Sequence, residues 1–342
     1  MKTSLLEYLQ CPFCENAFDL LAADPESAED TKQGLLFCRE CSRWFPVRDS
    51  IPEILPDFLR IRENDLLFLD SISTRLDTKV YRSLVKTTQA TLSYPPKTTD
   101  KGTEYKKAEM TIKNKVSDTS FFGPGFVSPF NPGNPEFTWQ LIRRLGNVIP
   151  LLELKPDDVV LDVGTGYAWT SEWLGKMGFT VIGVDICRTY LDIGRQRMKE
   201  QAPHLMVADV EKLPLKSGCF NAVLCFDAFH HIYNRKKAMK HFWRILKKGG
   251  NVTLAEPGAE HASAEAAQEV MKKYGILEKG MSLDDIKEYC AGLGFFDPEE
   301  HFIIDIPSGE RKKILTKKFV QSHIYADCHF YRVKKPAAEE NQ

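Results

Sequence analysis

The chain has 342 residues, of which 43% are hydrophobic and 27% are charged, and its formal net charge at pH 7 is −1. This composition is typical of a globular protein with room for two domains, and the balanced charge argues against a global basic surface for nucleic acid. No run approaches the roughly 18 apolar residues of a membrane span, and the first ten residues are too short and too polar for a signal peptide.

Nine cysteines are present, and four of them form two close pairs near the start, Cys11-Pro-Phe-Cys14 and Cys38-Arg-Glu-Cys41. Each C-x-x-C pair places two thiolates on one tight turn, and two such turns complete a tetrahedral Zn²⁺ site. Four thiolate ligands leave no open position, so the predicted zinc ion is structural and stabilises a small domain. Tight cysteine pairs without an export signal indicate a reducing, cytoplasmic location.

The first domain resembles the small zinc-binding domain related to the activator subunit of tRNA and release-factor methyltransferases. The resemblance covers about residues 3–58 and is carried by these residues: Leu5-Leu6, Cys11, Pro12, Cys14, Cys38, Cys41, Phe45-Pro46-Val47, Asp49 and Ile51-Pro52. It implies a zinc ribbon over residues 1–58 that can meet a protein partner. The first 60 residues hold six Lys or Arg and eleven Asp or Glu, which argues against phosphate binding and favours a scaffold or substrate-lid role.

Residues 59–135 are predicted to form a helical and irregular linker. Apolar residues at helical spacing indicate one or two helices between residues 61 and 84, and the Thr-, Lys-, Ser- and Pro-rich residues 87–103 predict a loop. Residues 121–135 mix aromatic and aliphatic residues with four prolines and three glycines, which excludes a regular helix or strand. This segment is either a rigid crossing between domains or a lid over a binding site, where aromatic rings exclude water.

From residue 136 onward the patterns of strand and helix alternate. Strands are predicted at 159–163, 180–185, 204–208, 222–226 and 251–255, and helices at 136–149, 170–177, 189–200 and 235–247. Repeats of this length predict an α/β fold with a doubly wound, Rossmann-like, mostly parallel sheet. Two further helices (260–274 and 282–293) and a closing hairpin (300–306 with 326–333) complete a domain over residues 136–335, and residues 336–342 are expected to be disordered.

Three acidic residues stand at or near the ends of predicted strands. The buried run Val159-Val-Leu-Asp-Val-Gly-Thr-Gly166 contains Asp162 and ends in a turn where two glycines allow the backbone to approach a ligand. Asp185 ends the second strand and can accept both hydroxyls of a ribose. Asp209 follows the third strand and can accept an adenine amino group, while the N–H of Val210 meets a ring nitrogen.

These residues, together with the runs 209–233 and 243–250, resemble class I S-adenosylmethionine (SAM)-dependent methyltransferases of the small-molecule and glycan branch. The resemblance covers about residues 140–335 and implies a seven-stranded sheet whose last strand is antiparallel. It implies that SAM is bound by Asp162, Gly164, Thr165, Gly166, Asp185, Ile186, Asp209, Val210 and Phe226. Ala168 stands where a third glycine often occurs, with Trp169 next. A nicotinamide dehydrogenase would instead need the spacing G-x-G-x-x-G/A, which this turn does not match.

Methyl transfer from a sulfonium is an in-line displacement, so the protein must supply position, a dry site and sometimes a base. The candidate bases Asp227, His230 and His231 follow the fourth strand, because a histidine with a near-neutral pKa can take a hydroxyl or carbon-acid proton. One histidine of such a pair can equally pack against the sheet. Glu256 follows the fifth strand toward the same crevice and is a further candidate.

We therefore expect a cytoplasmic SAM-dependent methyltransferase that modifies O or C of a small-molecule or glycan-type metabolite. The first alternative is a tRNA or rRNA methyltransferase, prompted by the relatives of the ribbon and by the basic run at residues 311–318, which can also be a solvated surface. The second alternative is a non-catalytic scaffold whose ribbon recruits a protein partner. In that case Trp169 or the Pro-rich segment would block the cofactor crevice.

Overall fold

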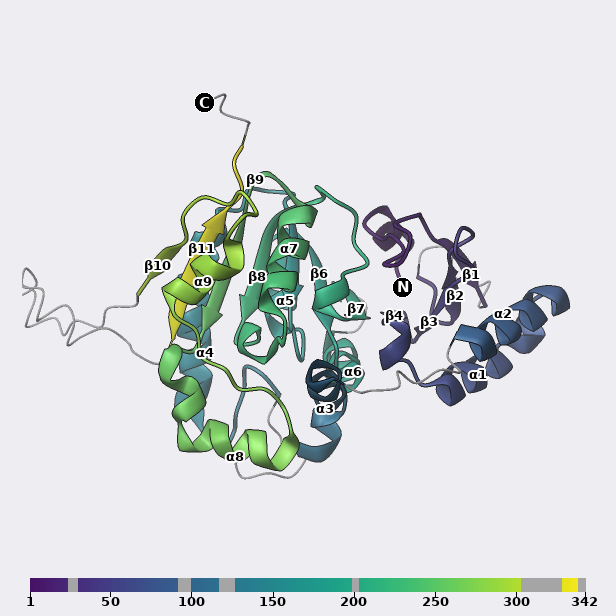
Figure 1. The fold of residues 1–342 in the computed structure, drawn as a ribbon, viewed down its shortest axis with the longest axis horizontal. Coiled ribbons are helices and arrows are strands. Elements are labelled where there is room, and N and C mark those ends of the chain that lie inside the picture. Colours follow the sequence, from purple (N-terminus) through teal and green to yellow (C-terminus); the bar gives the residue numbers. More distant parts are fainter. Residues whose placement is uncertain (24–29, 92–99, 117–126, 199–202, 303–327, 338–342) are drawn as a thin grey trace, which may run out of the picture.

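The computed structural model describes residues 1–23, 30–91, 100–116, 127–198, 203–302 and 328–337. The main sheet is mostly parallel and Rossmann-like, as predicted (Figure 1). In the described part of the chain, seven strands of this sheet run in the order β7-β6-β5-β8-β9-β11-β10. Their bounds are β5 Val159–Val163, β6 Thr180–Asp185, β7 His204–Ala208, β8 Phe220–Phe226, β9 Leu246–Glu256, β10 Glu299–His301 and β11 His329–Lys334. The last strand, β11, is antiparallel to both of its neighbours, which confirms the predicted fold class.

The amino-terminal segment begins with a short 3₁₀ helix, η1 (Thr3–Glu7), and then folds as a small antiparallel sheet. Its strands are β1 Asp19–Ala22, β2 Gly34–Phe37, β3 Trp44–Arg48 and β4 Ile51–Ile54. The strand β4 then pairs in parallel with β7, with Glu53 opposite Val207 and Ile54 opposite Ala208. The two sheets therefore form one continuous sheet, with eleven strands among the described residues, a junction that the sequence patterns did not predict.

The two sheets also share one apolar core. Leu5, Leu9 and Phe45 from the first domain belong to the same buried cluster as Leu215 and Phe220 from the second. The backbone of residues 8–10 pairs with that of residues 214–216, through the N–H of Gln10 to the carbonyl of Pro214 (2.9 Å) and of Lys216 to that of Tyr8 (2.8 Å). Burial of this shared apolar surface stabilises the two parts as one unit.

Helices cover both faces of the main sheet (Figure 1). They are α4 Pro135–Val148, α5 Trp169–Lys176, α6 Arg188–Met198, α7 Arg235–Ile245 and α9 Leu283–Cys290. A further helix, α8 (Glu265–Tyr274), lies beyond the edge of the sheet and packs against α3 (Lys101–Val116) (Figure 1). The helix α4 shows why these segments are helical. The side chain of Asn134 accepts a hydrogen bond from the N–H of Phe137, Pro135 opens the first turn, and one face of the helix buries Leu141 and Leu145.

The predicted loop at residues 87–103 is wrong at both ends. The helix α2 (Thr78–Thr91), which follows α1 (Arg62–Ser71), continues to Thr91, and a further helix, α3 (Lys101–Val116), begins at Lys101. Thr88 is buried, and its hydroxyl accepts a hydrogen bond from the Trp44 indole N–H (2.9 Å). This contact with the small sheet favours helix where the local composition favours a loop. Residues 92–99 lie outside the described part of the chain.

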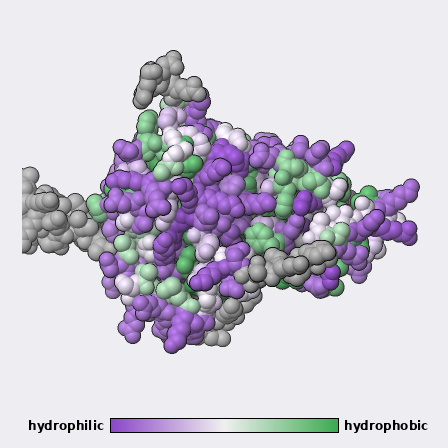
Figure 2. Space-filling model, in the orientation of Figure 1, coloured by the Kyte–Doolittle hydropathy of each residue, from purple (hydrophilic) through white to green (hydrophobic). Residues whose placement is uncertain are grey.

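The helix α3 packs against α6, α8 and the 3₁₀ helix η2 (Asp57–Leu59), so it joins the small domain to the main one. Of the predicted crossing or lid at 121–135, residues 121–126 lie outside the described part, as does the basic run at 311–318. The face drawn in Figure 2 is mainly hydrophilic, with apolar side chains in separate patches. Among the described residues, no helix is both long and apolar enough to cross a membrane.

Candidate active site and zinc centre

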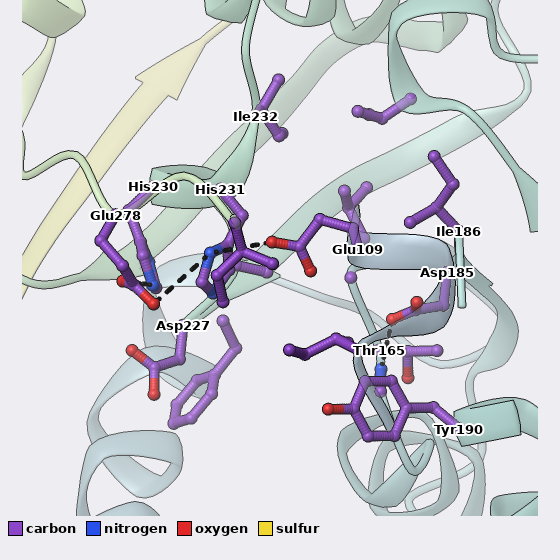
Figure 3. Close-up of a pocket in the computed structure, with 18 of the residues that line it drawn as sticks. Glu109, Thr165, Asp185, Ile186, Tyr190, Asp227, His230, His231, Ile232 and Glu278 are labelled. Atoms are coloured by element: carbon purple, nitrogen blue, oxygen red, sulfur yellow. Dashed lines mark hydrogen bonds and ion pairs between the residues drawn. The ribbon is translucent and has the colours of Figure 1, made fainter. Parts of the chain in front are cut away.

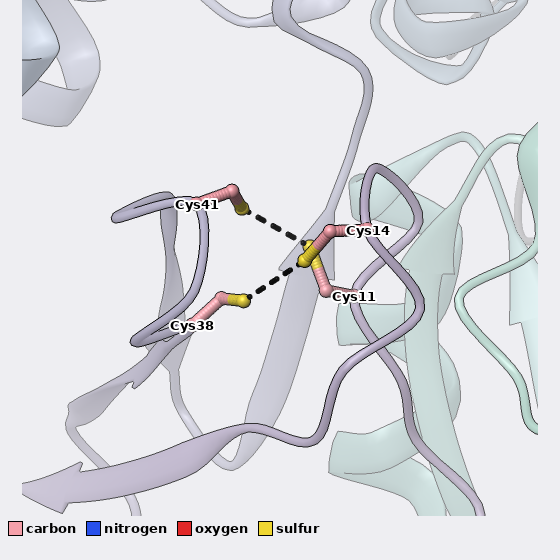
Figure 4. A group of neighbouring side chains, drawn as sticks. All are labelled: Cys11, Cys14, Cys38 and Cys41. Carbon is pink, nitrogen blue, oxygen red and sulfur yellow. Dashed lines mark hydrogen bonds between the residues drawn. The ribbon is translucent and has the colours of Figure 1, made fainter.

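The four predicted zinc ligands converge from the two turns that carry them (Figure 4). The Sγ atoms of Cys11 and Cys41 lie 3.5 Å apart, and those of Cys14 and Cys38 lie 3.3 Å apart. Zn–S bonds of about 2.3 Å in a tetrahedron place the sulfurs roughly 3.8 Å apart, so this donor set fits a structural Zn²⁺. None of the nine cysteines forms a disulfide, and the other five lie outside this cluster.

A cavity of about 670 Å³ opens at the carboxyl edge of the parallel strands. Most of the predicted cofactor residues line it: Gly164, Thr165, Gly166, Asp185, Ile186, Asp209, Val210 and Phe226. Asp227, His230 and His231 line its opposite end, so the structure brings the predicted cofactor and acid–base residues into one space (Figure 3). Ligands of open α/β sheets bind at this edge.

Asp162 does not line the cavity and instead lies buried behind the glycine turn. Its Oδ2 accepts hydrogen bonds from the hydroxyls of Thr165 (2.8 Å), Thr170 (2.6 Å) and Ser171 (2.5 Å). Burial raises the pKa of this carboxyl, and the three hydroxyls oppose that shift. Asp162 therefore links the glycine turn to the start of α5. Its side chain does not reach the cavity, so its position does not support the predicted direct contact with the cofactor.

Asp185 meets the expectation for a ribose-binding carboxylate. Its Oδ2 accepts the N–H of Gly166 (2.8 Å) and its Oδ1 accepts the N–H of Cys187 (2.7 Å). Each oxygen of a carboxylate has a second acceptor position, so both can still accept a hydroxyl from the cavity. Desolvation raises the pKa of Asp185 to about 6, so the group is largely ionised at neutral pH.

Backbone conformation accounts for the glycine turn. Gly164 has φ of +65° and Gly166 has φ of +53°, in the left-handed region that favours glycine. Ala168, at the position where a third glycine is common, also has a positive φ, +57°. Trp169 does not block the cavity. Its ring lies edge-on to Phe226, with ring centroids 5.5 Å apart, and forms part of the cavity lining.

Asp209 has a partner that the sequence patterns did not indicate. The Nζ of Lys106, from α3, lies 2.8 Å from Asp209 Oδ2 and 2.8 Å from Glu211 Oε2. The other Asp209 oxygen accepts the N–H of Glu211 (2.9 Å). If Asp209 accepts the adenine amino group as predicted, it must do so while it is paired with Lys106. This ion pair fixes α3 over the cavity.

Four described residues of α3 line the cavity, and the sequence patterns did not predict any of them as site residues: Tyr105, Lys106, Glu109 and Ile112. Three of them recur at helical spacing, which is a signal that could have revealed the helix. Glu109 Oε1 is buried and lies 3.4 Å from His231 Nδ1, without a hydrogen bond of good geometry. Burial and the nearby Glu278 raise the pKa of Glu109 to about 8.

The predicted bases differ in their surroundings. The Nδ1 of His230 lies 2.7 Å from Glu256 Oε2, and its Nε2 lies 3.3 Å from Glu278 Oε2. Burial alone would lower the pKa of His230, but the hydrogen bonds to these two carboxylates raise it to about 10. These contacts favour the protonated form of His230, which makes it a weaker candidate base than His231.

His231 and Asp227 show opposite behaviour. Burial and the adjacent charge of His230 lower the pKa of His231, whose Nδ1 lies 2.7 Å from the carbonyl oxygen of Leu277. Burial would raise the pKa of Asp227, but the guanidinium of Arg144, 3.2 Å from its Oδ1, lowers it overall. His231 is thus the neutral group of the three, whereas Asp227 is held as an ion pair and is a weak base.

Comparisons with known proteins agree with this geometry. A family model described as "Methyltransferase domain" matches residues 161–254, and one described as "Trm112p-like protein" matches residues 2–50. The chain is 26% identical over 199 residues to methyltransferase GfsG of Streptomyces halstedii, which covers 56% of this chain and 69% of that protein. It is 33% identical over 110 residues to a sarcosine/dimethylglycine N-methyltransferase of Halorhodospira halochloris, covering 31% of this chain and only 39% of that protein.

Among solved structures, the chain is similar to phosphoethanolamine N-methyltransferase 2 of Haemonchus contortus in complex with SAM. The TM-score is 0.50 at 20% identity, over 71% of this chain and 61% of that one, which shows a shared fold. The cavity residues fit SAM, because the glycine turn and Asp185 provide open backbone and a fixed carboxylate. The chain therefore joins a Trm112-like zinc-binding domain to a SAM-dependent methyltransferase domain.

Proposed function

We propose that this chain transfers a methyl group from SAM to an oxygen or carbon of a small-molecule or glycan-type metabolite. The observation that supports this proposal is the form of the cavity. It runs from the glycine turn and Asp185 to the histidines after β8, and α3 and α8 both contribute to its lining. A volume of about 670 Å³ is within the range of small-molecule sites and leaves limited room beside a cofactor.

Each end of the cavity has a separate role in this proposal. SAM, when bound, supplies a methyl group on a positively charged sulfur. Asp185 and the backbone around Gly166 would hold the cofactor, and Phe226 and Trp169 would exclude water beside it. His231, the neutral histidine, would accept a proton from the acceptor when the reaction needs a base. Position and desolvation carry most of the rate enhancement in such a displacement.

The relatives support an acceptor of small size. One is named for sarcosine and dimethylglycine, and the similar structure is of an enzyme named for phosphoethanolamine. These relatives are N-methyltransferases by name, so the choice of O or C as the acceptor atom rests on the sequence resemblance. No residue of the zinc-binding domain lines the cavity among those described, so the ribbon would act through η2 and α3 rather than on the acceptor.

The test uses SAM with a labelled methyl group and the full chain, offered separately to fractionated metabolites and to total RNA. We expect label in a low-molecular-weight product. The Asp185→Ala variant should lose at least about tenfold in SAM affinity, since it removes both ribose acceptors, equivalent to about 1.4 kcal/mol. Asp284→Ala is the matched control, because Asp284 is an exposed acid on α9. Label found only in RNA, in a reaction that weakens with salt, would favour the alternative function.

A further inference from the structure

Three side chains at the acceptor end of the cavity form a second group of metal-ligand type. They are His230, His261 and Glu278, whose ligand atoms all lie within 4.8 Å of one another. We propose that this histidine–glutamate cluster binds a divalent transition-metal ion that holds an oxygen of the acceptor. The role in methyl transfer rests on the proposed function, whereas the binding of the metal does not.

The distances within the cluster suit a small cation. Glu278 Oε2 lies 2.8 Å from His261 Nε2 and 3.3 Å from His230 Nε2. Ligands at about 2.0–2.1 Å from a tetrahedral metal lie roughly 3.3 Å apart, so small side-chain adjustments would complete the site. Two imidazoles and one carboxylate suit Zn²⁺ or Fe²⁺ better than Mg²⁺ or Ca²⁺, which prefer oxygen ligands.

The residues behind the cluster orient its ligands. Glu256 is fully buried at the end of β9, and its Oε1 accepts the N–H groups of Ala228 (3.0 Å) and Phe229 (2.8 Å). Its Oε2 lies 2.7 Å from Nδ1 of His230, so Nε2 faces Glu278. A carboxylate on the far nitrogen of a histidine is the usual arrangement behind a metal-bound imidazole.

A buried arginine fixes the loop that carries Glu278. The Nη2 of Arg235 donates to the carbonyl oxygens of His230 (2.6 Å) and Lys279 (3.0 Å). This contact holds the segment after α8 against the turn after β8, two segments that are far apart in the sequence. The cluster is thus built from three separate segments held at one place, rather than from neighbours on a flexible loop.

The local charge also calls for a cation. Glu256 and Glu278 both contact His230, at 2.7 Å and 3.3 Å. Glu109 Oε1 lies 3.4 Å from His231 Nδ1 (Figure 3). Two buried carboxylates, Glu256 and Glu278, on one imidazole need a compensating positive charge, which a bound metal ion would supply. His230, His261 and Glu278 all line the cavity, so a metal there would keep an open position toward the acceptor.

This location defines the class of acceptor. A metal ion lowers the pKa of a bound hydroxyl, so we infer an acceptor with a hydroxyl group near the transferred methyl. In the step, the hydroxyl proton passes to water and the oxygen forms the new bond to the methyl carbon. The bond from that carbon to sulfur breaks, and its electron pair stays on sulfur, which yields neutral S-adenosylhomocysteine.

The experiment titrates Co²⁺ into the full chain with zinc retained in the ribbon. We expect one additional equivalent to bind, with a visible spectrum of nitrogen and oxygen ligands and no thiolate charge-transfer band. The variants His261→Gln and Glu278→Gln should weaken Co²⁺ binding at least about tenfold, since each removes a ligand. The control His301→Gln removes a histidine that pairs with Glu299 at the surface, and it should bind Co²⁺ as the unaltered chain does.

Circular dichroism and SAM affinity show whether each variant folds. The cation site is wrong if no additional Co²⁺ binds, or if folded His261→Gln binds it with unchanged affinity. Methyl transfer measured on the same samples separates the two proposals. Co²⁺ binding with no methyl transfer to any acceptor overturns the proposed function alone, and methyl transfer that neither needs nor responds to the metal overturns the role of the metal in holding the acceptor.

Discussion

At the scale of single residues, the site depends on backbone conformations that side chains disfavour. Ala168 and Asp227 both have a positive φ, +57° and +55°. Ala168 lies in the turn after β5, and Asp227 lies in the turn after β8. Such residues cost about 1–2 kcal/mol each and persist only where the surrounding structure imposes them. Gly164 adds a steric reason, because a Cβ built there would lie 2.3 Å from the Cβ of Ala228.

The substitution Gly164→Ala should therefore lower the free energy of unfolding by roughly 2–4 kcal/mol, from backbone strain plus the clash. Urea unfolding measures the stability, and calorimetric titration measures the affinity for SAM. Gly166→Ala is the matched control, since φ there is +53° but no atom lies within 4 Å of the added Cβ. It should cost only about 1 kcal/mol of stability. Equal losses in the two variants would contradict the steric argument.

At the scale of elements, α3 connects the zinc-binding domain to the cofactor end of the cavity. Its amino-terminal half packs near η2, where Lys106 Nζ lies 5.9 Å from the ring centroid of Phe58. The same ammonium pairs with Asp209 and Glu211, whose side chains are 4% and 6% exposed. Because these carboxylates are buried, the lysine neutralises charge that would otherwise be unpaired.

Replacing Lys106 by Met should destabilise the protein by about 3 kcal/mol, because it leaves two buried carboxylates without their cation. SAM affinity should fall as well, since α3 would no longer be held over the cavity. The control Lys107→Met alters the exposed neighbour on the same helix and should change stability by less than about 0.5 kcal/mol. An unfolding midpoint and SAM affinity that Lys106→Met leaves unchanged would show that α3 is held by other contacts.

At the scale of the whole molecule, the zinc-binding domain is part of the main sheet and not an appended module. The pairing of β4 with β7 gives the main sheet four further strands and covers an edge that would otherwise be unpaired. Two arginines strengthen the join: Arg188 contacts Glu53 at 2.5 Å, and Arg195 lies 3.3 Å from Asp30. Loss of the ribbon would therefore expose core residues of the methyltransferase domain.

The variant Cys38→Ser tests this coupling, because it removes one zinc ligand. We expect loss of bound zinc and a decrease of at least about 3 kcal/mol in the free energy of unfolding, in one transition for the whole chain. Thermal unfolding and metal analysis measure the two effects. Cys219→Ser is the control, since Cys219 lies outside the cluster. Two separate transitions, with the later one unshifted, would mean that the domains unfold independently.

Sequence alone determined the features that depend on local spacing. The cysteine pairs predicted the zinc ligands because two turns need only short-range geometry, and the alternation from Val159 onward predicted the α/β fold because buried strands and amphipathic helices have characteristic periods. The cavity lining includes all but one of the predicted cofactor residues, since strand ends meet at one edge of a parallel sheet. Their contacts with SAM remain predictions.

Tertiary structure alone decided the features that join distant segments. Three contacts show this: β4 pairs with β7, Lys106 pairs with Asp209, and Glu278 contacts His230. The residues in these contacts are 48 to 154 positions apart in the sequence, and no short-range sequence pattern predicts them. The charge state of each histidine was decided in the same way. His230 and His231 are adjacent and chemically identical, yet burial beside different partners shifts their pKa values in opposite directions.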